Sequence, residues 1–172
     1  LKILRPNIER IVNADLQVLE GVATLLNSHG AKLGFDPKEV IDTFAEALDN
    51  ELDLRHEANS TKMLTSMTAD ETATFPEVFT EISTKRVLAI EEVHGAELTK
   101  WKDQNYTQEQ RDKIVANGAH AVVRQTLEIG FFHADPHPGN IFVLEGERLC
   151  FIDCGMTGRV EESMRKDLAM LL

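Results

Sequence analysis

The segment from His133 to Gly155 places acidic and amide side chains at intervals that suit phosphate chemistry. Asp135 and Asn140 flank a Pro-Gly loop, and Asp153 follows at the end of an apolar run. Phosphoryl transfer needs a carboxylate that orients the nucleophile and oxygen ligands that hold magnesium. Asp135 suits the first role. Asn140 and Asp153 suit the second, because Mg²⁺ prefers hard oxygen donors and completes its shell with phosphates and water.

Two short strands joined by a turn are expected to position these side chains. The pattern predicts strands at residues 141–144 and 149–152, with a turn at 145–147. Such a hairpin would bring Asp153 back beside Asn140. Asp, Asn, Gly and Pro are also ordinary turn residues, so any one of them alone favours a structural role. The joint spacing favours a functional site.

These residues resemble those of the UbiB/AarF family of atypical protein-kinase-like proteins, and in particular its bacterial branch. HADPHPGN stands where protein kinases have H-R-D-x-x-x-x-N, and IDCG stands where they have D-F-G. The resemblance implies a site that binds ATP and Mg²⁺. It implies that Asp135 is the catalytic aspartate and that Asn140 and Asp153 are magnesium ligands.

The resemblance continues toward the N-terminus and covers the chain from Lys2 to about Arg159. LKILRPNI is similar to the end of the family's third strand, which implies that Lys2 is the nucleotide-binding lysine. ELDLRHEANS is similar to the family's E-x-D segment. By that likeness Glu57 pairs with Lys2, and Glu51 opens the E-x-D motif.

The residues from Glu51 to Asn59 read as one helix. Six residues turn a helix by about 600°, so Glu51 and Glu57 would point about 120° apart and would not both meet Lys2. Asp53 and Glu57 would share a face, where a cation such as Lys2 would relieve their repulsion. The residues alone leave another interpretation open, in which Glu51 pairs with Arg55 on a solvated face.

Hydrophobic periodicity predicts the remaining elements. We expect an amphipathic helix at 7–26 packed into the core, a second helix capped by Asp36 and leading toward Glu57, and short strands between 75 and 95. Thr107 should cap a helix that ends at Gly130, with Ile114, Val115, Val122 and Val123 among its buried residues. A last helix should run through 161–172.

These elements predict an α+β, protein-kinase-like bilobal fold that is incomplete, with the N-lobe strands before Lys2 and the end of the C-lobe missing. Residues 1–172 would form a single partial domain, with the N-lobe part at about 1–94 and the C-lobe part at about 95–172. Residues 91–95 would form the hinge that contacts adenine. The chain has no G-x-G-x-x-G loop, so this fragment alone is expected to be inactive.

Composition narrows the class of protein. The chain has 172 residues, enough for one substantial core, and a net charge of −11, which argues against a nucleic-acid partner. No apolar run is long enough to span a membrane and no signal segment begins the chain, so this segment is expected to be cytoplasmic. The family resemblance leaves room for membrane association of the full-length protein at the cytoplasmic face of the inner membrane. Cys150 and Cys154 indicate a reducing compartment, and their spacing with His133 and His137 is poor for zinc.

The resemblance implies an atypical kinase or ATPase that supports ubiquinone biosynthesis or quinone-lipid homeostasis. Its partners would be ATP and quinone-type lipid precursors or a biosynthetic protein complex. Two alternatives stay open. One is a small-molecule phosphotransferase of the choline- or aminoglycoside-kinase type. The E-x-D segment and LKILRP disfavour it. The other is a pseudokinase that binds nucleotide as a scaffold without turnover, which the intact Asp135 disfavours.

Overall fold

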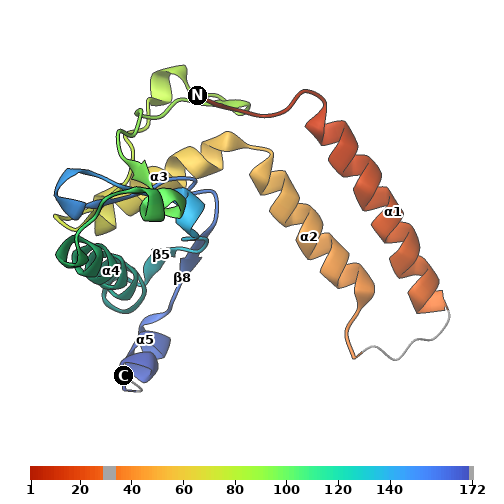
Figure 1. Ribbon diagram of the computed structural model, residues 1–172. Coiled ribbons are helices and arrows are strands. Elements are labelled where there is room, and N and C mark those ends of the chain that lie inside the picture. The colour runs from red at the N-terminus through yellow and green to blue at the C-terminus, as the bar shows by residue number, and fades with distance from the viewer. Residues whose placement is uncertain (29–33, 171–172) are drawn as a thin grey trace.

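The computed structural model describes residues 1–28 and 34–170, which fold into a mixed α+β structure (Figure 1). The α-helices are α1 (Ile8–Ser28), α2 (Pro37–Glu51), α3 (Leu54–Thr68), α4 (Gln108–Val123) and α5 (Glu162–Ala169). The strands are β1 (Lys2–Ile3), β2 (Ala73–Thr74), β3 (Val87–Leu88), β4 (Ala96–Glu97), β5 (Phe131–His133), β6 (Ile141–Val143), β7 (Leu149–Phe151) and β8 (Thr157–Arg159). Short helical turns are η1 (Thr80–Ile82), η2 (Leu98–Asp103), η3 (Arg124–Ile129), η4 (Pro138–Asn140) and η5 (Glu145–Glu147).

The strands form three small sheets. Strand β1 pairs with β3, and β5 pairs with β8, both antiparallel. The largest sheet has the order β2-β7-β6-β4, in which β2 and β7 are parallel and β6 and β7 form an antiparallel hairpin. This confirms the predicted hairpin, whose turn is η5. Gly146 sits there at φ 75°, a conformation that glycine adopts without steric cost.

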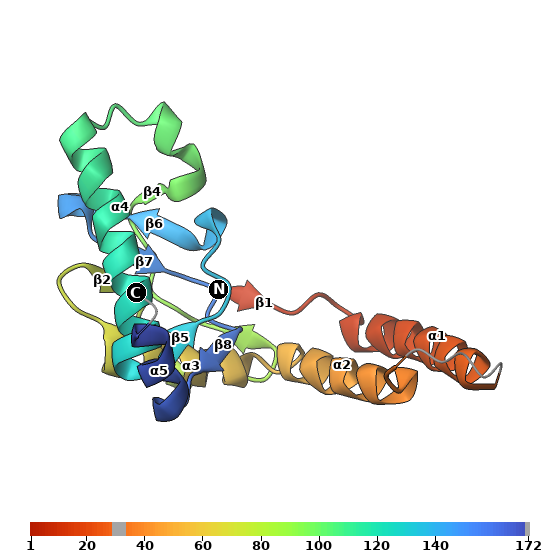
Figure 2. The ribbon, with the colours of Figure 1, turned by 90° about the horizontal axis from the view of Figure 1, so that it is seen from below.

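Two apolar clusters hold the fold together. The larger one joins α3, α4 and the four-stranded sheet, and it includes Leu64, Ile114, Leu149 and Phe151. Figure 2 shows α4 running beside this sheet. The smaller cluster joins α3 to β3, through Leu54, Ala58, Val78 and Leu88. The α+β fold class is confirmed, whereas the division near residue 94 stays a prediction. None of the helices in the described residues is long and apolar enough to cross a bilayer.

Helices α1 and α2 form a hairpin that stands away from the rest of the molecule (Figures 1 and 2). The predicted N-cap at Asp36 is confirmed, since its side chain accepts a hydrogen bond from the Lys38 backbone N–H. The predicted packing of the first helix into the core is wrong. Ile11 and Val22 are about half exposed, and Phe44 of α2 is exposed as well. The apolar stripe of α1 meets α2 only in part and does not reach either core cluster.

The predicted continuous helix across Glu51–Asn59 is also wrong. Helix α2 ends at Glu51, and α3 begins at Leu54 with Asp53 as its N-cap. The Asp53 carboxylate accepts a hydrogen bond from the Arg55 backbone N–H and forms an ion pair with the Arg55 guanidinium at 2.6 Å. Arg55 therefore pairs with Asp53 and not with Glu51. The break occurs because an extended aspartate satisfies the free N–H groups of a new helix.

Helix α4 and η3 deliver the chain into the segment that carries Asp135. Thr107 and Gln110 form the predicted capping box, and Gly130 ends the helical run at φ 77°. A Cβ at Gly130 would lie 2.7 Å from the Val160 carbonyl oxygen, so the close approach of β8 requires glycine. The buried face of this run holds Ile114, Ala121 and Gln125. Val115, Val122 and Val123 are exposed, which corrects the prediction that they are buried.

Candidate functional site

Three charged side chains from distant parts of the chain meet at one point. Lys2 Nζ lies 2.7 Å from Glu57 Oε2 and 2.6 Å from Asp153 Oδ1. Strand β1 supplies the lysine and α3 supplies the glutamate. The aspartate lies two positions after the end of β7. The predicted pairing of Lys2 with Glu57 is present in this geometry, together with a contact to Asp153 that the sequence did not predict.

Burial gives this cluster an unusual electrostatic balance. The Glu57 side chain is 8% exposed, whereas those of Lys2 and Asp153 are 41% and 49% exposed. Burial raises the pKa of Glu57, and the hydrogen bond from Lys2 offsets part of that rise. Burial alone would lower the pKa of Lys2, but the bonds to Asp153 and Glu57 raise it above the ordinary lysine value. The amine is therefore held in its charged form between two carboxylates.

The backbone at Asp153 turns sharply out of the hairpin. Asp153 has φ 55°, in the left-handed region that residues other than glycine seldom adopt. Directly before it, the Ile152 N–H donates to the Asn140 carbonyl oxygen at 2.8 Å. The hairpin thus brings the chain at Asp153 back to Asn140, as predicted. Strained backbone of this kind clusters at functional sites.

Asp135 and Asn140 belong to a second, adjoining group. The Asn140 Nδ2 amide donates to the Asp135 carbonyl oxygen at 3.4 Å, and Asn140 is buried. The Asp135 side chain is 47% exposed, and its Oδ2 lies 3.7 Å from His137 Nε2. This group joins the Lys2 cluster through the backbone bond between Asn140 and Ile152. The structure thus places all five predicted site residues in two neighbouring groups.

His133 braces the loop between these groups, a role that the sequence analysis missed. Its Nδ1 accepts a hydrogen bond from the Asp135 backbone N–H at 3.1 Å, and its Nε2 lies 3.0 Å from the Ile152 carbonyl oxygen. These partners assign the proton to Nε2. The ring is buried and receives further support from Gln125, whose Oε1 accepts from the His133 backbone N–H. In the sequence, the one signal for this role is a histidine two residues before Asp135.

A cavity of about 500 Å³ opens at the charged cluster. Its lining includes Lys2, Glu57 and Asp153 on one side and Ile90, Glu91 and Glu92 on another. The predicted hinge segment therefore reaches this cavity through Glu91 and Glu92. Within the described residues, no three or more His, Cys, Asp and Glu side chains form a group that would hold a metal ion by themselves.

Glu51 lies next to the turn that follows Asp153. A Cβ at Gly155 would be 3.6 Å from Glu51 Oε1, so the carboxylate lies against this turn. The charge of Glu51 also contributes to the raised pKa of Glu57, after burial and the Asp153 charge. The break between α2 and α3 leaves Glu51 beside the charged cluster without a bond to Lys2.

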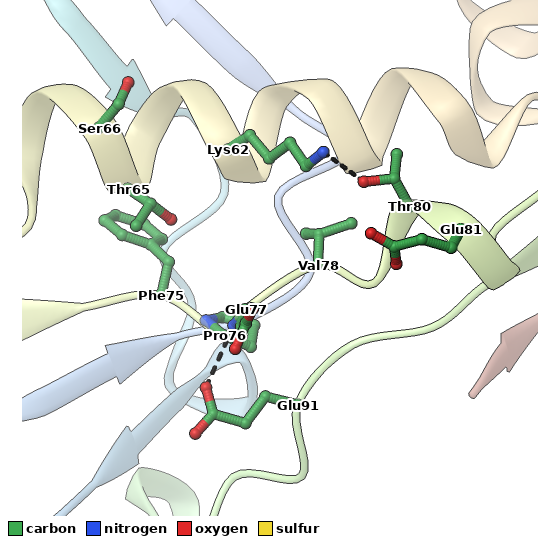
Figure 3. A pocket seen from close by; sticks show the side chains of 10 residues that line it. All are labelled: Lys62, Thr65, Ser66, Phe75, Pro76, Glu77, Val78, Thr80, Glu81 and Glu91. Atoms are coloured by element: carbon green, nitrogen blue, oxygen red, sulfur yellow. Dashed lines mark hydrogen bonds between the residues drawn. The ribbon is translucent and has the colours of Figure 1, made fainter.

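Another pocket, of about 490 Å³, lies beside α3 (Figure 3). Lys62, Thr65 and Ser66 of α3 line it together with residues of the 75–81 segment, and Lys62 Nζ donates to Thr80 Oγ1 at 2.5 Å. Glu91 lines both this pocket and the cavity at Lys2, and it accepts a hydrogen bond from the Glu77 N–H. None of the predicted site residues lines the pocket beside α3, so the cavity at Lys2 is the candidate site.

Comparison with known proteins shows the family of this chain. Residues 1–172 match the ABC1 atypical kinase-like domain. The chain belongs to the ABC1 atypical kinase-like family. Among related proteins of known sequence, ACTIVITY OF BC1 COMPLEX KINASE 3, chloroplastic, from Arabidopsis thaliana is 34% identical over 96% of this chain and 23% of its own length. A probable protein kinase UbiB from Aliivibrio salmonicida is 29% identical over 98% of this chain and 32% of its own length.

One solved structure has a similar fold. Rv3197 from Mycobacterium tuberculosis, determined in complex with erythromycin, superposes with a TM-score of 0.77 and 26% identity. The match covers 95% of this chain and 40% of Rv3197. The ABC1 chain described here thus spans less than half the length of each of these relatives. The UbiB-type resemblance and the kinase-like fold are confirmed.

Proposed function

We propose that this chain forms the Mg-ATP site of an atypical kinase or ATPase. The observation that supports this most directly is the meeting of Lys2, Glu57 and Asp153 at the mouth of a cavity of about 500 Å³. A charged amine held by a buried glutamate is suited to bind phosphate oxygens. Glu91 and Glu92 would place the adenine end of the nucleotide along the hinge segment.

The oxygen donors present fit magnesium that arrives with a nucleotide. Magnesium usually takes one or two protein ligands and completes its shell with phosphate oxygens and water. Asp153 offers a half-exposed carboxylate beside the cavity, and the Asn140 amide bonds through Nδ2, which leaves Oδ1 as the donor toward a metal. The ion would neutralise phosphate charge when bound. Lys2 would orient the phosphates, and Asp135 would orient the acceptor hydroxyl or water.

We also propose a biological role for the full-length protein. The UbiB-named relatives and the family resemblance support a link to ubiquinone biosynthesis or quinone-lipid homeostasis. We therefore propose quinone-type lipid precursors or a biosynthetic protein complex as partners. We place the full-length protein at the cytoplasmic face of the inner membrane.

Calorimetric titration of ATP into the full-length protein tests the nucleotide site. Wild type should bind ATP more tightly with Mg²⁺ than without it. Asp153→Asn should lose that magnesium dependence, and the same change at the exposed Asp103 should leave it intact. Absence of binding in wild type, or an unaltered magnesium dependence in Asp153→Asn, would rule out the proposed site.

A second comparison separates turnover from scaffolding. Asp135→Asn should retain Mg-ATP binding and lose phosphoryl transfer, with a drop in kcat of about 10²-fold or more. Equal turnover in Asp135→Asn and wild type would favour the pseudokinase alternative. Stimulation of turnover by choline or aminoglycosides, with no response to quinone precursors, would favour the small-molecule kinase alternative.

A further inference from the structure

An apolar cavity of about 300 Å³ lies between η2, α4 and β6, and Pro138 of the loop between Asp135 and Asn140 also lines it. Every residue that lines it is apolar or glycine. Its floor consists of Ile114, Ile141 and Leu149, which are at most 8% exposed and belong to the larger core cluster. The packed core therefore forms the floor of this pocket, and the exposed Val115 forms part of its rim.

Gly118 makes the room for this cavity. A Cβ at Gly118 would meet only Leu149 Cδ1, at an ordinary contact distance of 3.5 Å. Glycine inside a helix costs about 1 kcal/mol relative to alanine, so α4 is less stable with Gly118 than it would be with alanine at this position. A larger side chain at this position would occupy the cavity.

The wall formed by Trp101 is held in place before any ligand arrives. The guanidinium of Arg111 lies over the Trp101 ring at 5.6 Å from its centroid, and Arg111 Nε donates to the Tyr106 carbonyl oxygen. The indole N–H is the only polar side-chain atom among the lining residues. A preorganised aromatic wall reduces the ordering cost of binding.

We propose that this cavity binds one small apolar ring compound that carries at most one hydrogen-bond acceptor. Water in such a cavity lacks polar partners, and apolar cavities of about half this volume bind benzene. A charged ligand would lose its hydration with no group to replace it. Contact with Pro138 and Ile141 would place the ring against the loop that bears Asp135 and Asn140. The proposal does not depend on nucleotide binding.

Quenching of intrinsic fluorescence tests this proposal directly, because Trp101 is the only tryptophan of the chain. Bromobenzene, a contact quencher, should quench the fluorescence of Trp101 saturably in the full-length protein. The fluorescence of a Trp101→Phe variant gives the signal of any tryptophans outside this segment and is subtracted. 4-Bromobenzoate, which differs by one carboxylate, should bind at least about tenfold more weakly. Equal binding of the two probes, or quenching that rises linearly without saturation, would overturn the proposal.

Two variants locate the site. Gly118→Leu should weaken bromobenzene binding by about tenfold or more, because the new side chain fills the cavity. Ala116→Leu places the same leucine side chain at an exposed position of α4 and should leave binding unchanged. Val115→Asp provides a second test at a residue that is 61% exposed, where the substitution spares the core. Undiminished binding in folded Gly118→Leu, or in Val115→Asp, would contradict this assignment.

Discussion

Lys2 lies between the buried carboxylate of Glu57 and the half-exposed carboxylate of Asp153, and the bonds to both keep its amine in the charged form. The bond to Glu57 stabilises a carboxylate that burial would otherwise favour in its neutral form. The bond to Asp153 leaves the amine at the mouth of the cavity. An incoming phosphate would therefore meet a cation whose orientation is already set by two partners.

The titration of Lys2 should report these two bonds. Its pKa is raised in the folded protein, so its stabilising contribution is fully present below the ordinary lysine pKa and is lost as the pH rises through the raised value. In an NMR titration of the Lys2 side chain, Glu57→Gln and Asp153→Asn should each lower the midpoint relative to wild type. Identical midpoints in all three proteins would mean that the bonds are absent in solution.

His133 should contribute to stability through both ring nitrogens. His133→Ala leaves the Asp135 N–H and the Ile152 carbonyl without their partner, which should cost about 1–3 kcal/mol of unfolding free energy. His137→Ala, at a ring that is about half exposed and accepts one hydrogen bond from the Gly139 N–H, should cost less. Urea unfolding of the two variants measures the difference. Similar losses would show that His133 does not brace the loop.

At the scale of elements, the break between α2 and α3 positions both Glu51 and Glu57. Asp53 starts α3 afresh and places Glu57 in its first turn, facing Lys2. Glu51 remains at the end of α2, beside Gly155. A continuous helix would have set a different angle between the two carboxylates.

The N-cap at Asp53 can be separated from its ion pair with Arg55. Asp53→Ala should lower the unfolding free energy by about 1 kcal/mol, because the first turn of α3 loses its acceptor. Asp53→Asn keeps an acceptor for the Arg55 N–H and loses the charge pairing with the Arg55 guanidinium, whose side chain is 65% exposed, so the loss should be small. Its cost in a urea titration should be less than half that of alanine. Equal costs would assign the stability to the ion pair.

Local signals predicted the elements around the site well. The caps at Asp36 and Thr107, the stop at Gly130 and the β6–β7 hairpin all follow from turn and cap chemistry that acts within a few residues. The break at Asp53 was missed because the helical periodicity of the flanking residues continues through it. The Lys2–Asp153 contact was missed because it joins residues far apart in the sequence and depends on the left-handed turn at Asp153.

At the scale of the whole molecule, the core and the α1–α2 hairpin differ in how their apolar surface is covered. Periodicity correctly predicted that α1 has an apolar face, but it contains no information on what that face meets. In the structure it meets α2 and solvent, whereas α3 and α4 pack against sheets. This explains why the prediction that α1 packs into the core failed.

The two cysteines should report on the integrity of the core. Burial raises the pKa of Cys150 and of Cys154 to about 12, and both side chains are almost inaccessible. Reaction needs the thiolate and access to it, so neither thiol should react with iodoacetamide at pH 8 in the native protein. Both should react once urea unfolds the core. Fast labelling under native conditions would show that the core around β7 opens readily.

Hydrogen exchange should resolve the hairpin as a separate unit of lower stability. Its backbone amides are protected by helical bonds, but α1 packs mainly on α2, and few side chains of the hairpin are buried. Regions with few buried apolar contacts open at lower free energy than the core. Amides in the middle of α1 should therefore exchange at least about tenfold faster than those of α4, which packs on the four-stranded sheet.

Val18→Ser, at an exposed position of α1, should leave this difference unchanged, whereas substitution of the buried Ala23 by Asp should speed exchange throughout the hairpin and leave α4 unaffected. Equal protection of α1 and α4 would mean that the hairpin and the core unfold as one cooperative unit.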